Sequence, residues 1–313
     1  MQPIPKVATD WLAAKGARVL DGEDPAWKEH ADEVRALIYY SVHIDKPLLD
    51  QLPALEVIGK RGAGIDTVDL AEVKRRGIVV TNVGDGGNAA SVAEHAVTLV
   101  LAALRDIPRR DALTRAGRFT ERFTLPLFQE LTGNKVGLIG MGRIGRGMAA
   151  ILHHGFRCEV GYFDPYLEDP STAGVAWAQR FTTTGALLEW SSIVIVAAPL
   201  TKETRDLVRL DDLRLLGPKG VLVIASRGGI VNEADLATAL RDGVIAFAAT
   251  DVYDAEPPQP GHPFFGLDNM VLSPHIAGAS ERAREAAGLI VCDQVWALLH
   301  GEPAPTVDIE ALL

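Results

Sequence analysis

Short apolar runs alternate with amphipathic segments along almost the whole chain. Apolar runs bounded by Gly, Pro, Asn or Asp predict strands, and apolar positions three and four residues apart predict helices. This alternation is typical of α/β proteins, in which helices connect parallel strands. It falls into two blocks, and no internal repeat or low-complexity tract interrupts it.

The first block extends to about residue 100. It opens with a helix near residues 7–15 rather than with a strand, and a second helix is expected near residues 69–75. Strands are expected at 17–20, 36–40, 57–60 and 78–82. The block therefore predicts a small parallel sheet with helices between its strands.

A long and unusually apolar helix is expected from residue 91 to residue 105. Ser91 and Glu94 have the spacing of a capping box, and Pro108 marks a break after the helix. A helix so apolar must be covered by the other domain or by a second subunit.

The second block is more regular and predicts a doubly wound sheet, because crossover helices separate six strands. Helices are expected near 144–153 and 233–242, among others, and a last helix at 280–300 leads back toward the first block. The six strands are expected at 135–140, 160–163, 193–197, 221–225, 245–250 and 270–272.

Composition and charge narrow the class of protein. The formal net charge is −10, which argues against nucleic acid as the main partner because phosphate binding needs clustered positive charge. No apolar run reaches the ~18–20 residues of a membrane span, and the start lacks the apolar core of a signal peptide. Cys158 and Cys292 are the only cysteines, far apart and without metal-ligand spacing, so we expect no disulfide framework, no Cys-rich zinc site and a cytoplasmic location. No other metal site is expected.

A glycine-rich turn joins the strand KVGLIG to the helix that follows it. Gly140, Gly142 and Gly145 have the GxGxxG spacing of a dinucleotide-binding loop, with Arg143 and Ile144 between them. A bare GxGxxG is weak evidence, but a strand before it and a helix after it are the required context. The helix N-terminus would present N–H groups and partial positive charge to a pyrophosphate.

An acidic residue ends the next predicted strand. Asp164 follows Gly145 by 19 residues, where a carboxylate accepts hydrogen bonds from the ribose hydroxyls of NAD. It would also repel the 2′-phosphate of NADP, and no Arg follows it directly. The sequence therefore favours NAD.

Candidate catalytic side chains follow three later strands. Arg227 offers a planar cation for a carboxylate, His275 exchanges a proton near neutrality, and Glu256 would orient an imidazole and favour its charged form. Each also has an ordinary interpretation, as a surface charge or a loop residue. Counting residues does not show that the three meet.

The chain resembles the D-isomer-specific 2-hydroxyacid dehydrogenases over nearly its whole length. The resemblance places the family's catalytic arginine at Arg227, its glutamate at Glu256 and its acid/base histidine at His275. Five segments carry it, in the family's order: GLIGMGRIGRGMA, PLTKETRDLV, ASRGGIVNEADLATAL, DVYDAEPP and SPHIAG.

The resemblance implies an NAD-dependent oxidoreductase that transfers hydride between the nicotinamide and C2 of a 2-hydroxy or 2-keto acid. His275 would move the hydroxyl proton, and Glu256 would hold the His275 side chain. Arg227 would bind the substrate carboxylate. Further cofactor contacts are implied at Pro199, Ala225, Ser226, Asp251 and Gly278.

The resemblance also implies a substrate-carboxylate loop in KRGAGIDTVDL, through the backbone of Ala63 and Gly64. Lys60 and Arg61 flank this loop, either to hold a second anion such as a phosphate or as solvated charges. The segment SVAEHAVTL resembles the start of the interdomain helix, whose domain usually forms a homodimer.

The implied architecture is a Rossmann-type NAD domain at residues 101–285 and a smaller flavodoxin-like α/β substrate domain from residues 1–100 and 286–313, with a cleft between them that closes on the substrate. Three features depart from the family. The opening strand is missing, so either the chain starts inside a longer product or the small sheet is a strand short. The loop at 83–88 is altered, and Ile224 stands where Asn is common.

The sequence is also compatible with other functions. A 3-phosphoglycerate dehydrogenase is the main rival within the family. Formate dehydrogenases of this fold carry Gln in place of Glu256, and phosphite dehydrogenases carry Lys in place of Ala63. These two residues therefore argue against both functions. A dinucleotide-sensing binding protein related to corepressors is the rival from another class, because a fold does not determine a function.

Overall fold

The computed structural model describes residues 4–62, 64–65, 67–84, 87–125, 127 and 129–312. The chain divides into two compact units, one from Met1–Asn88 with Ala279–Leu313 and one from Ala89–Gly278. The boundaries expected from the sequence lay at 100/101 and 285/286. They differ because each of two long helices, Ala89–Arg105 and Glu281–Leu299, stays whole within one unit.

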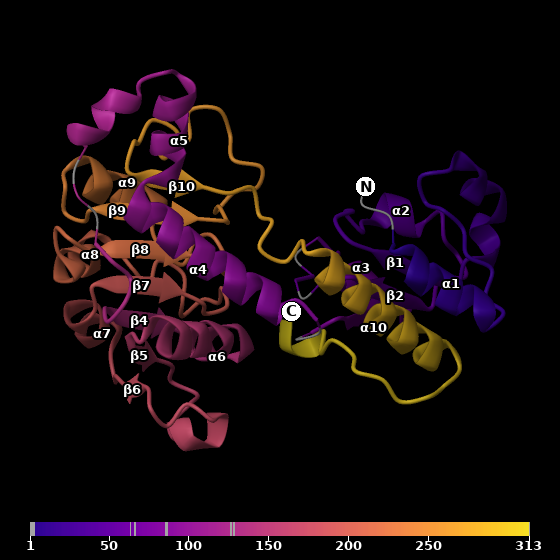
Figure 1. The fold of residues 1–313 in the computed structure, drawn as a ribbon. Coiled ribbons are helices and arrows are strands. Elements are labelled where there is room, and N and C mark those ends of the chain that lie inside the picture. The colour runs from indigo at the N-terminus through magenta and orange to yellow at the C-terminus, as the bar shows by residue number, and fades with distance from the viewer. Residues whose placement is uncertain are drawn as a thin grey trace. The chain divides into compact units, whose positions relative to one another are not determined.

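The larger unit contains a seven-stranded sheet in the order β10-β9-β8-β7-β4-β5-β6, with all neighbours parallel (Figure 1). The order in which strands are added reverses between β4 and β7: β5 and β6 lie on one side of β4, and β7 to β10 lie on the other, as in a Rossmann fold. The strands are β4 Lys135–Ile139, β5 Glu159–Phe163, β6 Gln179–Arg180, β7 Ile193–Val196, β8 Val221–Ile224, β9 Phe247–Thr250 and β10 Met270–Leu272.

Helices cover both faces of this sheet. Helices α4 and α6 pack on each other over one face, and α7, α8 and α9 form a row over the other (Figure 1). The α-helices are α4 Ala89–Arg105, α5 Ile107–Arg115, α6 Arg143–Ala150, α7 Thr184–Trp190, α8 Leu210–Leu216 and α9 Glu233–Arg241. Short turns of other helix types are Phe119–Phe123, Ile151–Gly155 and Pro170–Ala173.

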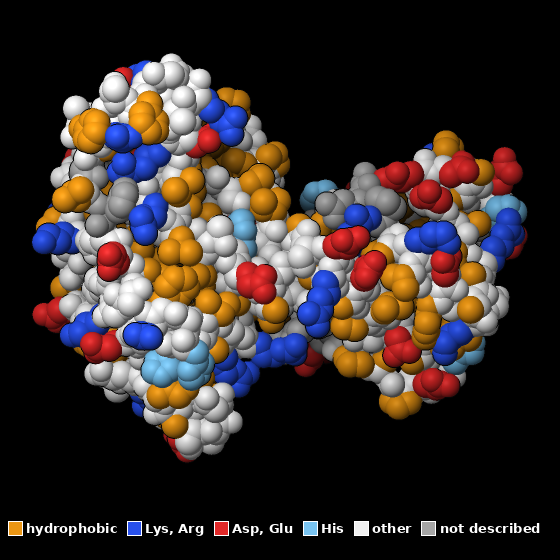
Figure 2. Space-filling view, viewed as in Figure 1, with side chains coloured by type: hydrophobic (Ala, Val, Ile, Leu, Met, Phe, Trp, Pro, Cys, Tyr) orange, Lys and Arg blue, Asp and Glu red, His pale blue; other side chains and the backbone are white. Residues whose placement is uncertain are grey.

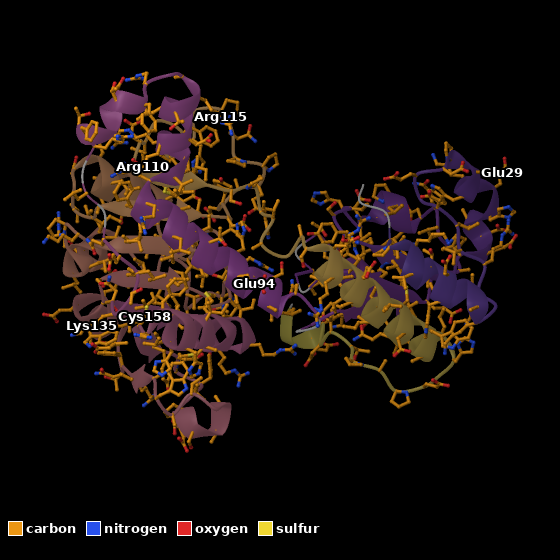
Figure 3. All side chains as sticks on the ribbon, in the orientation of Figure 1. Glu29, Glu94, Arg110, Arg115, Lys135 and Cys158 are labelled. Atoms are coloured by element: carbon orange, nitrogen blue, oxygen red, sulfur yellow. The ribbon has the colours of Figure 1, made fainter. Side chains whose placement is uncertain are left out.

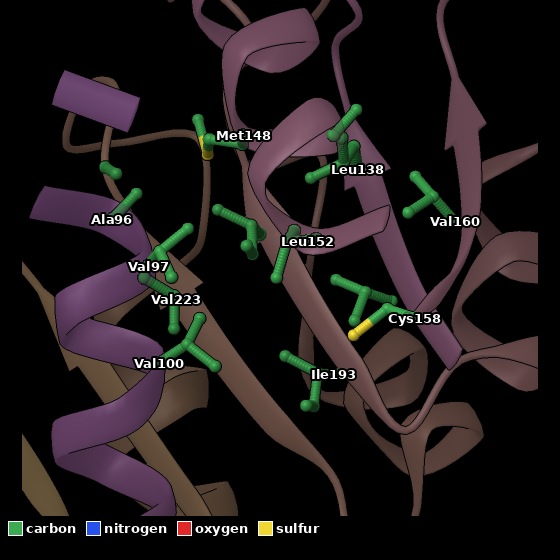
Figure 4. Close-up of a cluster of buried hydrophobic side chains, with 14 of the residues drawn as sticks. Ala96, Val97, Val100, Leu138, Met148, Leu152, Cys158, Val160, Ile193 and Val223 are labelled. Carbon is green, nitrogen blue, oxygen red and sulfur yellow. The ribbon is translucent and has the colours of Figure 1, made fainter. Parts of the chain in front are cut away.

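Buried side chains alternate between two cores, as a strand covered on both faces requires. On β7, Ile193 and Ile195 face the core under α4 and α6, whereas Val194 and Val196 face the core under α7 and α8. Figure 4 shows part of the first core, to which α4 contributes Ala96, Val97 and Val100, α6 contributes Met148, and the sheet contributes Leu138 and Val223.

The smaller unit has a parallel sheet in the order β1-β2-β3, also covered on both faces. Helices α1 and α10 lie over one face. The elements are α1 Lys6–Ala14, the 3₁₀ segment Pro25–Glu33, β1 Ala36–Tyr39, α2 Lys46–Leu49, β2 Val57–Lys60, α3 Leu70–Arg76, β3 Val79–Asn82, α10 Glu281–Leu299 and the 3₁₀ turn Glu310–Leu312.

The α/β fold class with a Rossmann-type sheet is confirmed, but two local predictions are wrong and one short strand was missed. Residues 17–20 form no strand, because this short run stays largely exposed and pairs with no neighbour. The two-residue strand β6 escaped prediction because both residues are polar and exposed. Ser91 is not a helix cap: α4 begins at Ala89, and the Ser91 hydroxyl donates to the carbonyl of Ala277 at 2.7 Å.

Candidate active site

The residues singled out by the sequence in the larger unit gather at the carboxyl edge of its sheet. Because all seven strands are parallel, the segments that follow them emerge at the same edge, where open α/β sheets bind ligands. The glycine loop follows β4, Asp164 follows β5 and Pro199 follows β7. Arg227 follows β8, the segment with Asp251 and Glu256 follows β9, and His275 follows β10.

The three glycines of the loop after β4 have distinct surroundings. A Cβ on Gly140, whose φ is +99°, would lie 2.8 Å from the backbone N of Ala198. A Cβ on Gly145 would lie 2.4 Å from the carbonyl oxygen of Gly140. A Cβ on Gly142 would meet no atom within 4 Å, so this residue leaves open space beside the helix end. Gly140 therefore makes the tight turn, Gly145 allows close helix packing, and Gly142 leaves the space that a pyrophosphate needs.

The start of α6 fits a phosphate group. Gly142 is the N-cap, and no side chain among the described residues caps this end, so its backbone amides face outward. Asp164 is tied to the same loop: Oδ2 accepts from the Met141 N–H at 2.8 Å, and Oδ1 accepts from the Tyr166 N–H at 2.9 Å. The carboxylate is therefore held beside the glycine loop, where the acidic residue of a dinucleotide site belongs.

Other residues expected to contact the cofactor lie along the same edge and differ in how far they are buried. The Oγ of Ser226 is buried and finds no hydrogen-bond partner among the described residues, as expected for a polar atom that awaits a ligand. Pro199 is exposed and Ala225 is buried. The side chain of Ile144 packs on the core, so only its backbone is available, whereas Arg143 is exposed on the first turn of α6. Gly278 is half-buried.

His275 and Glu256 form a direct pair. The Nδ1 of His275 lies 2.6 Å from Oε2 of Glu256, and Oε1 of the same carboxyl group accepts from the Tyr253 N–H at 3.0 Å. With its N–H on Nδ1 directed at Glu256, the ring turns Nε2 away from the pair. The His275 side chain is 45% exposed and that of Glu256 is 36% exposed, so Nε2 can reach a substrate.

The surroundings of Glu256 favour its ionised form. Burial alone would raise its pKa, whereas the hydrogen bonds from His275 and Tyr253 lower it. The positive charges of His275 and Arg227 act in the same direction, so the pKa of Glu256 lies below its ordinary value. Arg227 is thus electrostatically coupled to the pair, and its Nη1 donates to the Ser226 carbonyl at 2.8 Å.

Sequence reasoning missed the glycine that brings two of these segments together. A Cβ on Gly228 would lie 2.0 Å from the carbonyl carbon of Tyr253 and 2.3 Å from the N of Asp254. The backbone after Arg227 therefore packs directly on the backbone just before Glu256. The Gly-Gly pair in SRGGI was the available signal, because a glycine marks a close backbone approach as well as a turn.

Asp251 is fully buried beneath the loop that carries His275. Its Oδ1 accepts from the Ser273 hydroxyl at 2.5 Å and from the Ile276 N–H at 2.9 Å. Its Oδ2 accepts from the Ala277 N–H at 2.8 Å. The observed role of Asp251 is to hold this loop, and its contact with the nicotinamide stays a prediction.

The smaller unit contains the residues that are expected to bind the substrate, and the structure describes all of them except Ala63. The ammonium group of Lys60 donates to the Tyr40 carbonyl and lies 4.8 Å from the centre of the Tyr39 ring. Arg61 is buried, its guanidinium lies 4.7 Å from the Tyr40 ring centre, and burial together with the charge of Arg284 lowers its pKa. Gly64 lies in a loop, and Ala63 falls outside the described residues.

Two general expectations concern metals and membranes. Within the described part of the chain, no three His, Cys, Asp or Glu side chains are grouped to hold a metal ion. Among the described helices, none is long and apolar enough to cross a membrane. The cytoplasmic location stays a prediction.

Comparison with known proteins assigns the family. Residues 97–277 match the model of the D-isomer specific 2-hydroxyacid dehydrogenase NAD-binding domain. The chain therefore belongs to the D-isomer-specific 2-hydroxyacid dehydrogenases, oxidoreductases that act on CH–OH groups with NAD or NADP.

Individual relatives span several substrates. A glyoxylate reductase of Thermofilum pendens is 38% identical over 268 residues, which cover 84% of this chain and 78% of the relative. A D-3-phosphoglycerate dehydrogenase of Archaeoglobus fulgidus is 34% identical over 313 residues and 96% of this chain, but the match covers only 57% of that relative.

Among solved structures, an NADPH-dependent glyoxylate/hydroxypyruvate reductase of Sinorhizobium meliloti in complex with NADP and malonate is similar over 98% of this chain and 94% of its own. Its TM-score is 0.80 and its identity is 33%.

Proposed function

We propose that this protein is an NAD-dependent D-2-hydroxyacid dehydrogenase that reduces a small 2-keto acid at C2 and catalyses the reverse oxidation. The observation that carries the proposal is the His275–Glu256 pair at 2.6 Å, with Arg227 close enough to act on the charge of Glu256. A histidine whose Nδ1 is held by a carboxylate and whose Nε2 is accessible can serve as the proton donor to a carbonyl oxygen.

The three side chains have separate tasks in this reaction. His275 donates the proton from Nε2 to the carbonyl oxygen, or takes it back during oxidation. Glu256 keeps the ring oriented and stabilises its charged form. Arg227 binds the substrate carboxylate with its planar guanidinium. A bound nicotinamide supplies or accepts the hydride at C2, which completes the electron balance.

The residues present fit a dinucleotide. Gly142 leaves room for the pyrophosphate, the amides of the first turn of α6 face it, and Ser226 offers an unused hydroxyl. Asp164 supports NAD as the preferred cofactor, since its carboxylate is held in place and the following Pro165 and Tyr166 are uncharged. The preference is tested by comparing kcat/KM with NADH and NADPH, in the wild type and in Asp164→Ala.

The substrate class is tested by following NADH oxidation at 340 nm with glyoxylate, hydroxypyruvate, pyruvate, 2-oxoglutarate and phosphohydroxypyruvate. The glyoxylate and hydroxypyruvate reductases among the relatives support the two-carbon and three-carbon acids. Turnover of one of these that is lost in His275→Ala supports the proposal. Tight NADH binding without turnover of any acid contradicts it and favours a dinucleotide sensor.

A phosphorylated substrate is the second candidate. The match to a D-3-phosphoglycerate dehydrogenase and the cations of Lys60 and Arg61 favour it. A kcat/KM for phosphohydroxypyruvate well above that for hydroxypyruvate would support this candidate. A preference that survives Lys60→Ala would show that this cation does not carry it.

We further propose that the protein forms a homodimer through the segment at 107–127. Ile107, Phe119, Phe123 and Leu127 are large apolar side chains exposed close together in the sequence, and Arg122 lies 4.2 Å from the centre of the Phe119 ring. Figure 2 shows hydrophobic and basic side chains together at the end of the larger unit that holds α5. Apolar patches with Arg are typical of interfaces. Light scattering should give twice the chain mass, and Phe123→Asp should reduce it.

A further inference from the structure

Helix α4 contacts the loop that carries His275 at two places. The Ser91 hydroxyl donates to the carbonyl of Ala277 at 2.7 Å. One helical turn later, Nε2 of His95 lies 3.1 Å from the hydroxyl oxygen of Ser273. Residues four apart lie on the same face of a helix, so one face of α4 contacts the loop on both sides of His275.

The hydrogen atoms in this cluster can be assigned. The Ser273 hydroxyl donates its single hydrogen to Oδ1 of Asp251 at 2.5 Å, so toward His95 its oxygen is an acceptor. Nε2 of His95 also lies 3.3 Å from Oδ1 of Asp251. His95 must therefore carry a hydrogen on Nε2 and donate it to the Ser273 oxygen, with the Asp251 carboxylate directly beside it. This donor joins the Ser273 hydroxyl and the two backbone amides around a carboxylate that is 1% exposed.

This arrangement holds His275 in a backbone conformation that a side-chain-bearing residue rarely adopts. The φ of His275 is +54°, in the left-handed region. Such a residue persists only when its surroundings fix it on both sides. Ser273 fixes the loop before His275, and the Ile276 and Ala277 amides fix it afterwards, all through Asp251.

We propose that His95 is a positioning residue, which donates from Nε2 to Ser273 beside the buried Asp251 carboxylate and so holds the loop of residues 273–277 in the conformation that presents His275 to Glu256. Its catalytic consequence rests on the proposed function, whereas its effect on the loop does not. No contact between His95 and the substrate is required.

The test compares three variants. His95→Leu removes the donor, and His95→Gln replaces it, because the glutamine Nε2 lies at nearly the same reach as the imidazole Nε2. Glu94→Gln is the matched control, since Glu94 is the neighbouring exposed residue on α4 (Figure 3). The first readout is amide hydrogen exchange at Ile276 and Ala277 measured by NMR, and the second is kcat together with KM for the keto acid.

In His95→Leu we expect exchange at Ile276 and Ala277 to accelerate about tenfold or more, while the central strands keep their protection. We expect kcat to fall about 10- to 100-fold while KM changes by less than about threefold, because a misplaced acid slows the chemical step without removing the carboxylate anchor. His95→Gln should restore both readouts to within about threefold of the wild type, and Glu94→Gln should change neither.

Unchanged exchange at Ile276 and Ala277 in His95→Leu would overturn the proposal. So would a loss of kcat that His95→Gln does not rescue and that accompanies faster exchange throughout the larger unit, because that result indicates a purely structural role. If the wild type reduces no keto acid, the proposed function fails, and the exchange data alone still decide whether His95 holds the loop.

Discussion

The Nδ1 of His275 lies 2.6 Å from Oε2 of Glu256, although the two residues follow different strands of the sheet. The pair depends on two loops that meet at the carboxyl edge. One of them packs through Gly228 against the segment that carries Arg227, and the other closes around the buried Asp251.

Replacing Glu256 tests the electrostatics of the pair. Because the pKa of Glu256 is lowered in the folded protein, its ionised form stabilises the fold above its ordinary pKa of about 4.5. This contribution is lost as the pH falls through the lower, folded value. In urea unfolding, the advantage of the wild type over Glu256→Gln should therefore shrink from pH 6 to pH 3.5. A difference that is constant or larger at acid pH would contradict the assignment.

Replacing Arg227 with lysine tests the role of the guanidinium. Lysine keeps the charge but not the planar pair of donors, so kcat/KM for the keto acid should fall about 10- to 100-fold. The dissociation constant of NADH, measured by fluorescence, should stay within about twofold of the wild type because Arg227 serves the substrate. Weaker NADH binding with an unchanged KM for the keto acid would assign Arg227 to the cofactor.

Two alanine substitutions in the glycine loop should separate binding from folding. Gly142→Ala adds a Cβ in open space, so the fold should be unchanged while NADH binding weakens about tenfold or more, or about 1.4 kcal/mol. Gly145→Ala places a Cβ 2.4 Å from the Gly140 carbonyl oxygen and should lower the free energy of unfolding by about 1–3 kcal/mol. Thermal unfolding and NADH titration of both variants check this. Equal NADH affinity in Gly142→Ala and the wild type would place the pyrophosphate elsewhere.

Gly228→Ala should reduce activity without touching a catalytic side chain. Its Cβ would overlap the backbone of Tyr253 and push the Arg227 and Glu256 segments apart. A displacement of about 1 Å can lower kcat by about 100-fold. Gly155→Ala is the control, because a Cβ there meets no atom within 4 Å. Steady-state kinetics of both variants should show loss only for Gly228→Ala, and full activity of that variant would refute this account of the loops.

The sequence predicted the parts of the fold that depend on local pattern. Most strands of the larger sheet are apolar runs covered on both faces, and the glycine loop was recognisable between a strand and a helix. The strand expected at 17–20 failed because its apolar run is short and stays at the surface. The two-residue β6 has no apolar signal at all.

Contacts between distant residues could not be predicted from the pattern alone. Ser91 and Glu94 had the spacing of a capping box, yet Ser91 bonds to Ala277 far along the chain. Nothing in the sequence indicated that His95 lies next to Asp251, because this contact depends on how α4 crosses the sheet. The candidate catalytic residues came from the family resemblance, and only the structure revealed the contact between His275 and Glu256.

In the proposed reaction, His275 takes the proton from the C2 hydroxyl group of a D-2-hydroxy acid while hydride passes from C2 to NAD. The most direct test supplies NAD with the separate D- and L-enantiomers of glycerate and lactate and follows NADH formation at 340 nm. We expect oxidation of at least one D-enantiomer, none of its L-enantiomer, and a loss of at least about 100-fold in His275→Ala. Oxidation of the L-enantiomer, or activity that survives in His275→Ala, would contradict the claim.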